Sequence, residues 1–139
     1  MKKALLVIST LLLGAWIVSA QQGQTPPKPA DSKIPPEVAQ KANPVKPSAE
    51  SHAKAKKFYA IDCAMCHGEN GDGKGDMAAD IKGVTDFTNP DSMKDRTDGE
   101  LFYIIRKGRG EMPPEGDRAK DDDVWSLVNY VRAFSKKKE

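Results

Sequence analysis

Two cysteines and a histidine occupy one short stretch near the middle of the chain. Cys63 and Cys66 are the only cysteines, and His67 directly follows the second one. A disulfide between residues this close would close too small a loop to stabilise a fold. Two thiols about one helical turn apart can instead each add to a vinyl group of one haem, while the adjacent imidazole binds the iron. The motif therefore predicts one covalently attached haem c, with His67 as an iron ligand.

Other chemistry of a Cys-x-x-Cys pair lacks support in the rest of the sequence. A thioredoxin-like dithiol needs a βαβ context, and no segment alternates convincingly as a strand does. A tetrahedral zinc site needs four ligands, and His52 is the only further cysteine or histidine. His52 lies on the opening turns of the helix that leads into the motif, so we expect it to be a surface residue and not a second haem ligand.

The motif is expected to lie at the end of a helix. Ser48 is a suitable N-cap, and Ala55, Phe58 and Tyr59 then share one face at helical spacing. Gly68, directly after the motif, is expected to end this helix. The pattern places the two thiols and the histidine at the end of an amphipathic helix.

Three further segments have helical patterns. A short helical piece is expected near residues 77–81. Thr97 and Glu100 form a capping box ahead of a helix over 100–107, and a last helix begins around 121–123 with three aspartates. Without a convincing strand, the folded part is predicted to be all-α.

The N-terminal region has the pattern of an export signal. Lys2 and Lys3 precede an apolar stretch over 4–18, and Val18-Ser19-Ala20 is a small-residue cleavage site. We expect residues 1–20 to be a signal peptide and the mature protein to be periplasmic. The apolar stretch is short for a membrane span, but an uncleaved segment would be a possible membrane tether.

Residues 21–47 contain seven of the ten prolines and no aromatic residue, which predicts a disordered, extended linker. A single folded domain is then expected over 48–139. A domain this small and polar usually needs a cofactor, a metal or disulfides to be stable. No basic stripe alternates with aromatic residues, so nucleic acid is not expected as a partner.

Four features occur in the order typical of one family. They are an aromatic pair at 58–59, the Cys-x-x-Cys-His motif at 63–67, a Gly-Arg-Gly-Glu-Met-Pro-Pro loop at 108–114 and a terminal helix with Trp125 and Tyr130. Over about 49–134 the chain resembles the class I c-type cytochromes, the monohaem cytochrome c domain family. The resemblance implies a small cytochrome c fold of about three to five helices around one haem, with Ala55 where the first and last helices cross.

The resemblance also implies Met112 as the sixth iron ligand. Glycines make the loop pliable before this residue and prolines stiffen it afterwards. A thioether opposite the imidazole favours Fe(II) and raises the reduction potential. Met65 lies inside the motif and cannot reach the far face of a haem, whereas Met77 and Met93 remain alternatives that are more typical of core or surface positions.

Many relatives have a proline after the motif whose carbonyl receives the proton of the ligand imidazole. No proline lies between His67 and Pro90 here, so a carbonyl near residues 76–83 is expected in that role. Arg106 could pair with a haem propionate or be a solvated helix-end residue. Trp125 and Tyr103 are expected to serve packing and not electron relay.

The sequence thus predicts an electron carrier and not an enzyme. We expect single-electron transfer by a haem with His67 and Met112 as axial ligands, either in a periplasmic carrier or in a tethered subunit of a redox complex. The partners would be redox proteins, and the chain would be a monomer or one subunit of a larger complex. The rival prediction is a peroxidase or gas-binding protein, which needs Met112 displaced and has only carboxylates and Arg109 as distal groups.

Overall fold

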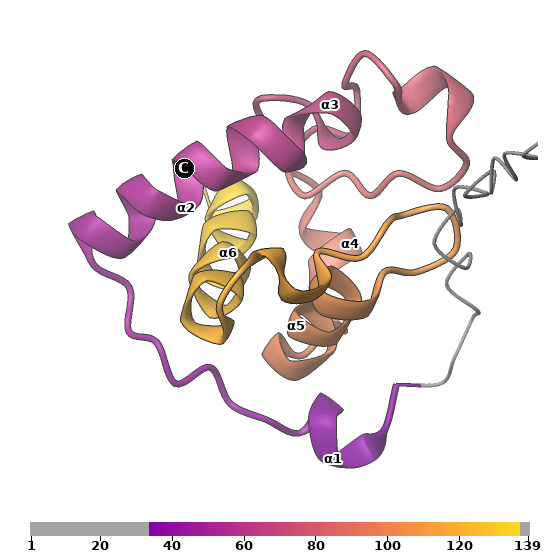
Figure 1. The fold of residues 1–139 in the computed structure, drawn as a ribbon. Coiled ribbons are helices and arrows are strands. Elements are labelled where there is room, and N and C mark those ends of the chain that lie inside the picture. Colours follow the sequence, from indigo (N-terminus) through magenta and orange to yellow (C-terminus); the bar gives the residue numbers. More distant parts are fainter. Residues whose placement is uncertain (1–33, 137–139) are drawn as a thin grey trace, which may run out of the picture.

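Two long helices, α2 (Ala49–Asp62) and α6 (Asp121–Ser135), cross at the centre of the fold (Figure 1). This is a computed structural model that describes residues 34–136. Helix α6 buries an apolar stripe with Val124, Leu127 and Val128 almost fully inaccessible to solvent. Ala55 of α2 is buried in the same core, in agreement with the small residue expected at the crossing.

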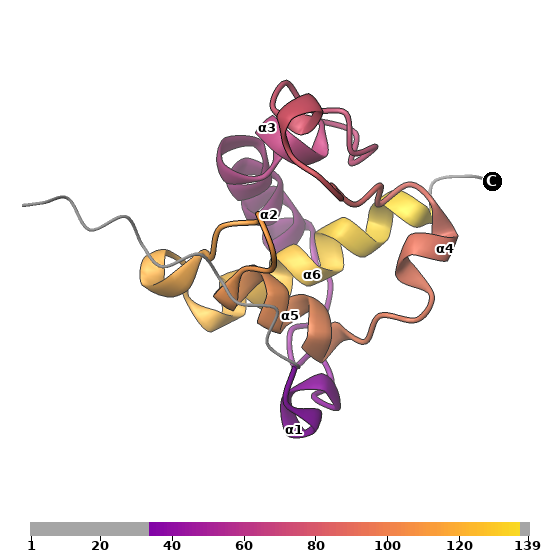
Figure 2. The ribbon, with the colours of Figure 1, turned by 90° about the vertical axis from the view of Figure 1, so that its right-hand side faces the viewer.

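Shorter elements surround this pair. Helix α3 (Ala64–His67) follows α2 after a bend at Cys63, and the remaining elements are α1 (Pro36–Ala39), η1 (Ala78–Asp80), α4 (Pro90–Met93), α5 (Asp98–Lys107) and η2 (Gly116–Arg118). Figure 2 shows α6 between α2 and α3 on one side and α5 and α1 on the other.

The described residues form six α-helices and two 3-10 turns, against the expected three to five helices. The excess comes from α1, α3 and α4, each of only four residues. Over 34–136 the only β-type pairing is an isolated bridge between Arg109 and Met112, so the all-α prediction is confirmed there.

The predicted helix starts after Ser48 and Thr97 and the predicted end at Gly108 are confirmed, whereas the helix expected to run through the motif to Gly68 is interrupted at Cys63. Ser48 accepts a hydrogen bond from the backbone of Ser51, and Thr97 and Glu100 form the expected capping box. Gly108 ends α5 with φ +75°, a left-handed backbone that favours glycine. Local sequence therefore determines where α2 and α5 begin and where α5 ends.

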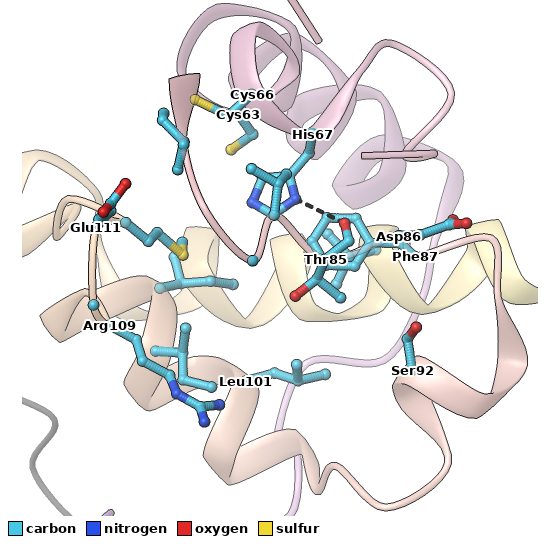
Figure 3. A pocket seen from close by; sticks show the side chains of 18 of the residues that line it. Cys63, Cys66, His67, Thr85, Asp86, Phe87, Ser92, Leu101, Arg109 and Glu111 are labelled. Atoms are coloured by element: carbon cyan, nitrogen blue, oxygen red, sulfur yellow. Dashed lines mark hydrogen bonds between the residues drawn. The ribbon is translucent and has the colours of Figure 1, made fainter. Parts of the chain in front are cut away.

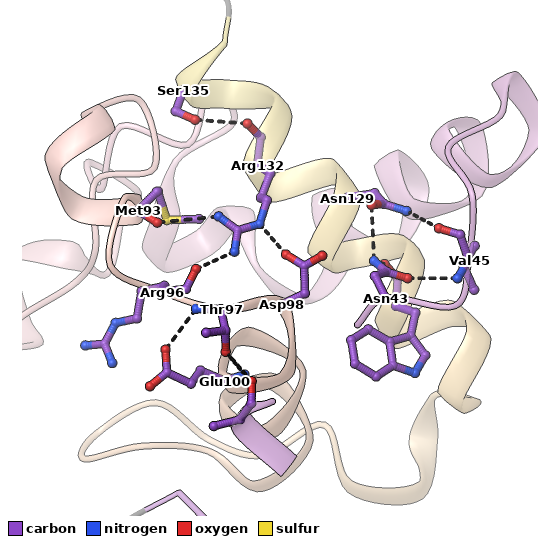
Figure 4. A network of polar contacts seen from close by, with 12 residues as sticks. Asn43, Val45, Met93, Arg96, Thr97, Asp98, Glu100, Asn129, Arg132 and Ser135 are labelled. Atoms are coloured by element: carbon purple, nitrogen blue, oxygen red, sulfur yellow. Dashed lines mark hydrogen bonds and ion pairs between the residues drawn. The ribbon is translucent and has the colours of Figure 1, made fainter. Parts of the chain in front are cut away.

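Residues 34–47 differ from the expected disordered linker because they pack against α5 and α6. The Asn43 Nδ2 donates to the Trp125 carbonyl (2.9 Å) and to Asn129 Oδ1 (3.1 Å), and Asn129 Nδ2 donates to the Val45 carbonyl (2.9 Å) (Figure 4). The two side-chain amides thus connect residues 34–47 to helix α6. The folded domain therefore begins before Ser48, and we call residues 34–47 the N-terminal strap.

Helix α1 of the strap contacts the start of α5. The Thr97 hydroxyl donates to the Ala39 carbonyl at 2.6 Å. Gly99 is buried here, and a Cβ at this position would overlap the Val38 carbonyl oxygen. The close approach of strap and helix therefore depends on the missing side chain of Gly99.

The signal peptide predicted over 1–20, and the part of the predicted linker before residue 34, lie outside the described residues. Within 34–136, none of the helices has the length and apolar character needed to cross a membrane.

Candidate haem site

A pocket of about 670 Å³ opens between α3, α5, α6 and two long loops (Figure 3). Its volume lies within the range of about 300–1,000 Å³ typical of small-molecule and cofactor sites. The four predicted site residues all line it: Cys63, Cys66, His67 and Met112. The fold thus brings together two segments that lie more than forty residues apart in the sequence.

Apolar side chains form the inner wall of this pocket. Leu101, Ile104 and Ile105 contribute from α5, and Leu127 and Val131 contribute from α6. In Figure 3 Leu101 lies across the pocket from His67. Such a wall suits a flat apolar ring whose polar edge faces the opening.

His67 is held in one orientation by a backbone carbonyl. Its Nδ1 lies 3.1 Å from the Thr85 carbonyl oxygen, so Nδ1–H donates and the Nε2 lone pair is left available. Its ring stacks on Phe87, with centroids 4.4 Å apart. Burial lowers the pKa of His67 while the bond to Thr85 opposes the shift, so the imidazole is neutral near neutral pH.

Thr85 lies beyond the range 76–83 in which the carbonyl was expected, so that prediction was wrong. The glycine-rich loop after the motif folds back on itself, and Gly73 N–H donates to the His67 carbonyl at 2.9 Å. Phe87 N–H donates to the Gly71 carbonyl at 2.7 Å. These two bonds set the 85–87 segment beside the imidazole.

Cys63, at the N-cap of α3, and Cys66, within α3, are both half-buried residues with free thiols. Burial raises the pKa of the Cys63 thiol to about 12, with the carboxylates of Glu115 and Asp62 adding to the effect. A thiol that stays protonated is a poor metal ligand. Within 34–136, no group of three or more His, Cys, Asp or Glu side chains is arranged to hold a metal ion.

A tight turn presents Met112 to the pocket. Arg109 N–H donates to the Met112 carbonyl (3.1 Å), and Met112 N–H donates to the Arg109 carbonyl (2.9 Å). The turn requires Gly110, whose φ is +57°. Of the alternatives, Met77 is 43% exposed and does not line the pocket, whereas Met93 is buried and lines it from α4.

The chain is similar to known proteins over most of its described residues. Residues 50–131 match the family described as cytochrome c oxidase, cbb3-type, subunit III. The chain belongs to this family of c-type cytochromes. Transfer of electrons is the function shared by such cytochromes.

Cytochrome c6 proteins are similar to this c-type cytochrome. That of Cladophora glomerata is 32% identical over 89 residues, covering 60% of this chain and 88% of its own. That of Pyropia tenera is 29% identical over 82 residues, covering 59% and 91%. The shared region is thus nearly the whole of each relative.

Two solved structures are also similar. One is a chain of the Kuenenia stuttgartiensis reducing HAO-like protein complex Kustc0457/Kustc0458, with a TM-score of 0.58 and 26% identity over 66% of this chain. This cytochrome spans only 46% of that chain. The other is the KustC0563 c-type cytochrome, with a TM-score of 0.53, 26% identity, and coverage of 58% and 95%.

The residues present fit the haem c that the family implies. The pocket has two thiols at one rim, a neutral imidazole with a free Nε2, a thioether on a separate loop and an apolar inner wall. No buried side-chain polar atom among the described residues lacks a hydrogen-bond partner. The site therefore needs no polar ligand atoms at its inner wall.

Other residues singled out from the sequence have structural roles. Arg106 is not a solvated helix-end residue and does not line the pocket. It donates to the carbonyls of Gly116 and Ala119 and pairs with Asp121 at 2.5 Å. Trp125 stacks on Phe102, with centroids 4.2 Å apart, which agrees with packing.

His52 is exposed, as expected, and its ring lies 5.1 Å from that of Tyr130. The sequence pattern places Tyr59 on the apolar helix face without a polar role, and it does not single out Glu115. The Tyr59 hydroxyl donates to the Gly68 carbonyl at 2.8 Å, directly behind the motif. Glu115 is buried at the rim of the pocket, although it lies in a polar loop that gives no signal of burial.

Proposed function

We propose that this cytochrome carries single electrons through one haem c bound by thioether bonds to Cys63 and Cys66, with His67 and Met112 as axial ligands. The observation that carries the proposal is the His67 ring, fixed by the Thr85 carbonyl inside a pocket lined by both thiols and by Met112. When bound, the haem supplies a reversible one-electron couple.

Each residue has a defined part in this site. The Thr85 carbonyl selects the His67 tautomer and makes Nε2 a stronger donor to a metal. The ring of Phe87 stacks on the imidazole and limits its rotation. With the Met112 thioether as a second ligand beside His67, the iron would have no free coordination site for a substrate.

The sixth ligand is tested by comparing Met112→Ala with Met93→Ala. We expect Met112→Ala to lose the Fe(III)–sulfur charge-transfer band, to lower the potential and to bind carbon monoxide in the reduced form. Met93→Ala removes the rival sulfur in the pocket and should keep the band. The opposite result would assign the ligand to Met93. A wild-type protein that lacks the band and binds carbon monoxide would favour the peroxidase or gas-binding function.

Redox proteins are the proposed partners, and the surface beside the motif is the proposed contact. Ile61 (73% exposed), Met65 and Met77 are the exposed large hydrophobic residues of the described chain. Met77 N–H donates to the Met65 carbonyl at 3.0 Å, so these two lie side by side next to the attachment motif. Exposed apolar side chains at a cofactor edge favour brief protein contacts.

We also propose export to the periplasm, where the chain is a carrier or a tethered subunit of a redox complex. The support is the signal-like pattern of residues 1–20. N-terminal sequencing of protein from the periplasmic fraction should give a start near Gln21. A start at Met1 in the membrane fraction would instead support a tether.

A further inference from the structure

Glu115 is the one acidic residue buried within residues 34–136. It is 6% exposed and lines the pocket in which the haem is proposed to bind. Its backbone N–H donates to the Ile105 carbonyl at 2.9 Å, which holds the residue against α5. Neither covalent attachment nor axial ligation uses this side chain, so its presence calls for another role.

The Glu115 carboxylate lies within a small charged cluster next to the first attachment cysteine. Arg118 Nη2 donates to Glu115 Oε2 at 2.9 Å, and Arg118 Nη1 donates to Asp62 Oδ1 at 3.3 Å. Asp62 directly precedes Cys63, and the charge of Glu115 is felt at the Cys63 sulfur. The cluster therefore lies at the rim where the haem would be attached.

The negative charge of Glu115 is only partly neutralised. Two carboxylates share the Arg118 guanidinium, and the Arg118 side chain is 61% exposed against 8% for that of Glu115. Water screens the exposed guanidinium more than the buried carboxylate. Arg106 of α5 also faces Glu115, but it is already paired with Asp121. The carboxylate thus remains a buried charge facing the pocket.

Burial raises the pKa of Glu115, Asp62 adds to the rise, and Arg118 and Arg106 oppose it. The side chain can therefore change charge at milder pH than an exposed glutamate. A bound haem would exclude further water from this wall. The lower local dielectric would strengthen the interaction between the Glu115 carboxylate and the charge on the haem iron.

We propose that Glu115 couples the potential of the haem to pH, taking up a proton when the haem is reduced and releasing it on oxidation. This rests on the proposed function. One electron from a donor protein converts Fe(III) to Fe(II), and one proton from solvent converts the Glu115 carboxylate to the acid. Because the oxidised site has one more positive charge, it favours the carboxylate, and the reduced site favours the neutral acid.

The test is potentiometric titration of the haem-loaded wild type, Glu115→Gln and Asp117→Asn over a range of pH. In the wild type the reduction potential should fall with rising pH across one pH interval. The equilibrium constant for reduction should change by at most about tenfold per pH unit, which corresponds to about 59 mV for one electron. Glu115→Gln should keep the higher, acid-side potential throughout. Asp117→Asn, an equal charge change at an exposed neighbour, should keep the sloping interval.

A second variant keeps the proposal testable if Glu115→Gln does not mature. Arg118→Gln alters an exposed side chain and removes the partner that lowers the pKa of Glu115. The sloping interval should then move to higher pH. A slope that persists in Glu115→Gln, or an interval that Arg118→Gln leaves in place, would assign the proton to another group such as a haem propionate and overturn the proposal.

These outcomes are separable from failure of the proposed function. If the protein has no covalent haem, the proposed function itself is wrong. If haem is attached and the spectrum is that of His/Met ligation, but the wild-type potential does not change with pH, only the inference about Glu115 is wrong.

Discussion

The Tyr59 hydroxyl donates to the Gly68 carbonyl at 2.8 Å, in a buried position directly behind the motif. Tyr59→Phe should lower the free energy of unfolding by about 1 kcal/mol, because the carbonyl loses a buried partner. Urea denaturation of the haem-loaded protein measures this change. Tyr103→Phe removes the hydroxyl of a half-buried residue and should have little effect; equal losses would contradict the assigned role.

The imidazole of His67 is positioned by a neighbour that no side-chain pattern could have revealed. The Thr85 carbonyl is a backbone group, and any residue at this position would supply it. The sequence could predict that some carbonyl must receive the Nδ1 proton, because an unanchored ligand histidine is rare. It could not predict which one, because the answer depends on how the loop after Gly68 folds back.

At the scale of secondary structure, helix boundaries follow directly from local sequence. Ser48 and the pair Thr97 and Glu100 cap their helices as predicted because the capping side chains act within one turn. The N-terminal strap was not predicted. Its composition is that of a linker, and its attachment depends on the Asn43 amide reaching α6, which is distant in sequence.

The contact between the strap and α5 predicts the sign of the stability change that Gly99→Ala causes. Replacing a helical glycine with alanine usually stabilises a protein by about 0.5–1 kcal/mol. Gly99→Ala should instead destabilise this protein by about 1–3 kcal/mol, because the new Cβ overlaps the Val38 carbonyl. Thermal or urea unfolding of the haem-loaded protein gives the difference.

The control for Gly99→Ala is the same substitution in a chain that begins at Ser48. Without the strap no overlap remains, so the substitution should become neutral or stabilising. A destabilisation of equal size in both backgrounds would show that the strap is not the cause.

For the molecule as a whole, the pocket is large compared with the core that surrounds it. Without an occupant, water would reach the apolar wall formed by α5 and α6, and the contacts that an occupant makes with this wall would be lost. Small domains have only about 5–15 kcal/mol of net stability. The fold therefore depends on whatever fills this pocket.

This dependence predicts the behaviour of a chain that cannot attach haem. The double variant Cys63→Ser, Cys66→Ser should be degraded quickly or recovered with much reduced helicity and no cooperative unfolding transition. Far-UV circular dichroism and limited proteolysis measure both properties. His52→Ala changes an exposed residue outside the pocket and should keep haem and cooperativity. A haem-free double variant that unfolds as cooperatively as the wild type would contradict the prediction.

The strap also determines where the domain is joined to the rest of its chain. Residue 34 leads into α1, which lies beyond α5, whereas α3 with Cys66 and His67 lies at the opposite end of the molecule (Figures 1 and 2). If the preceding residues hold the protein to a surface, the domain is attached at its α1 end, and the attachment motif at the α3 end faces away from that surface. A redox protein could then approach Met65 and Met77 without steric obstruction from the anchor. Lengthening or shortening the chain before residue 34 would change the distance that the haem can reach from the surface, and the attachment motif would still face its partner.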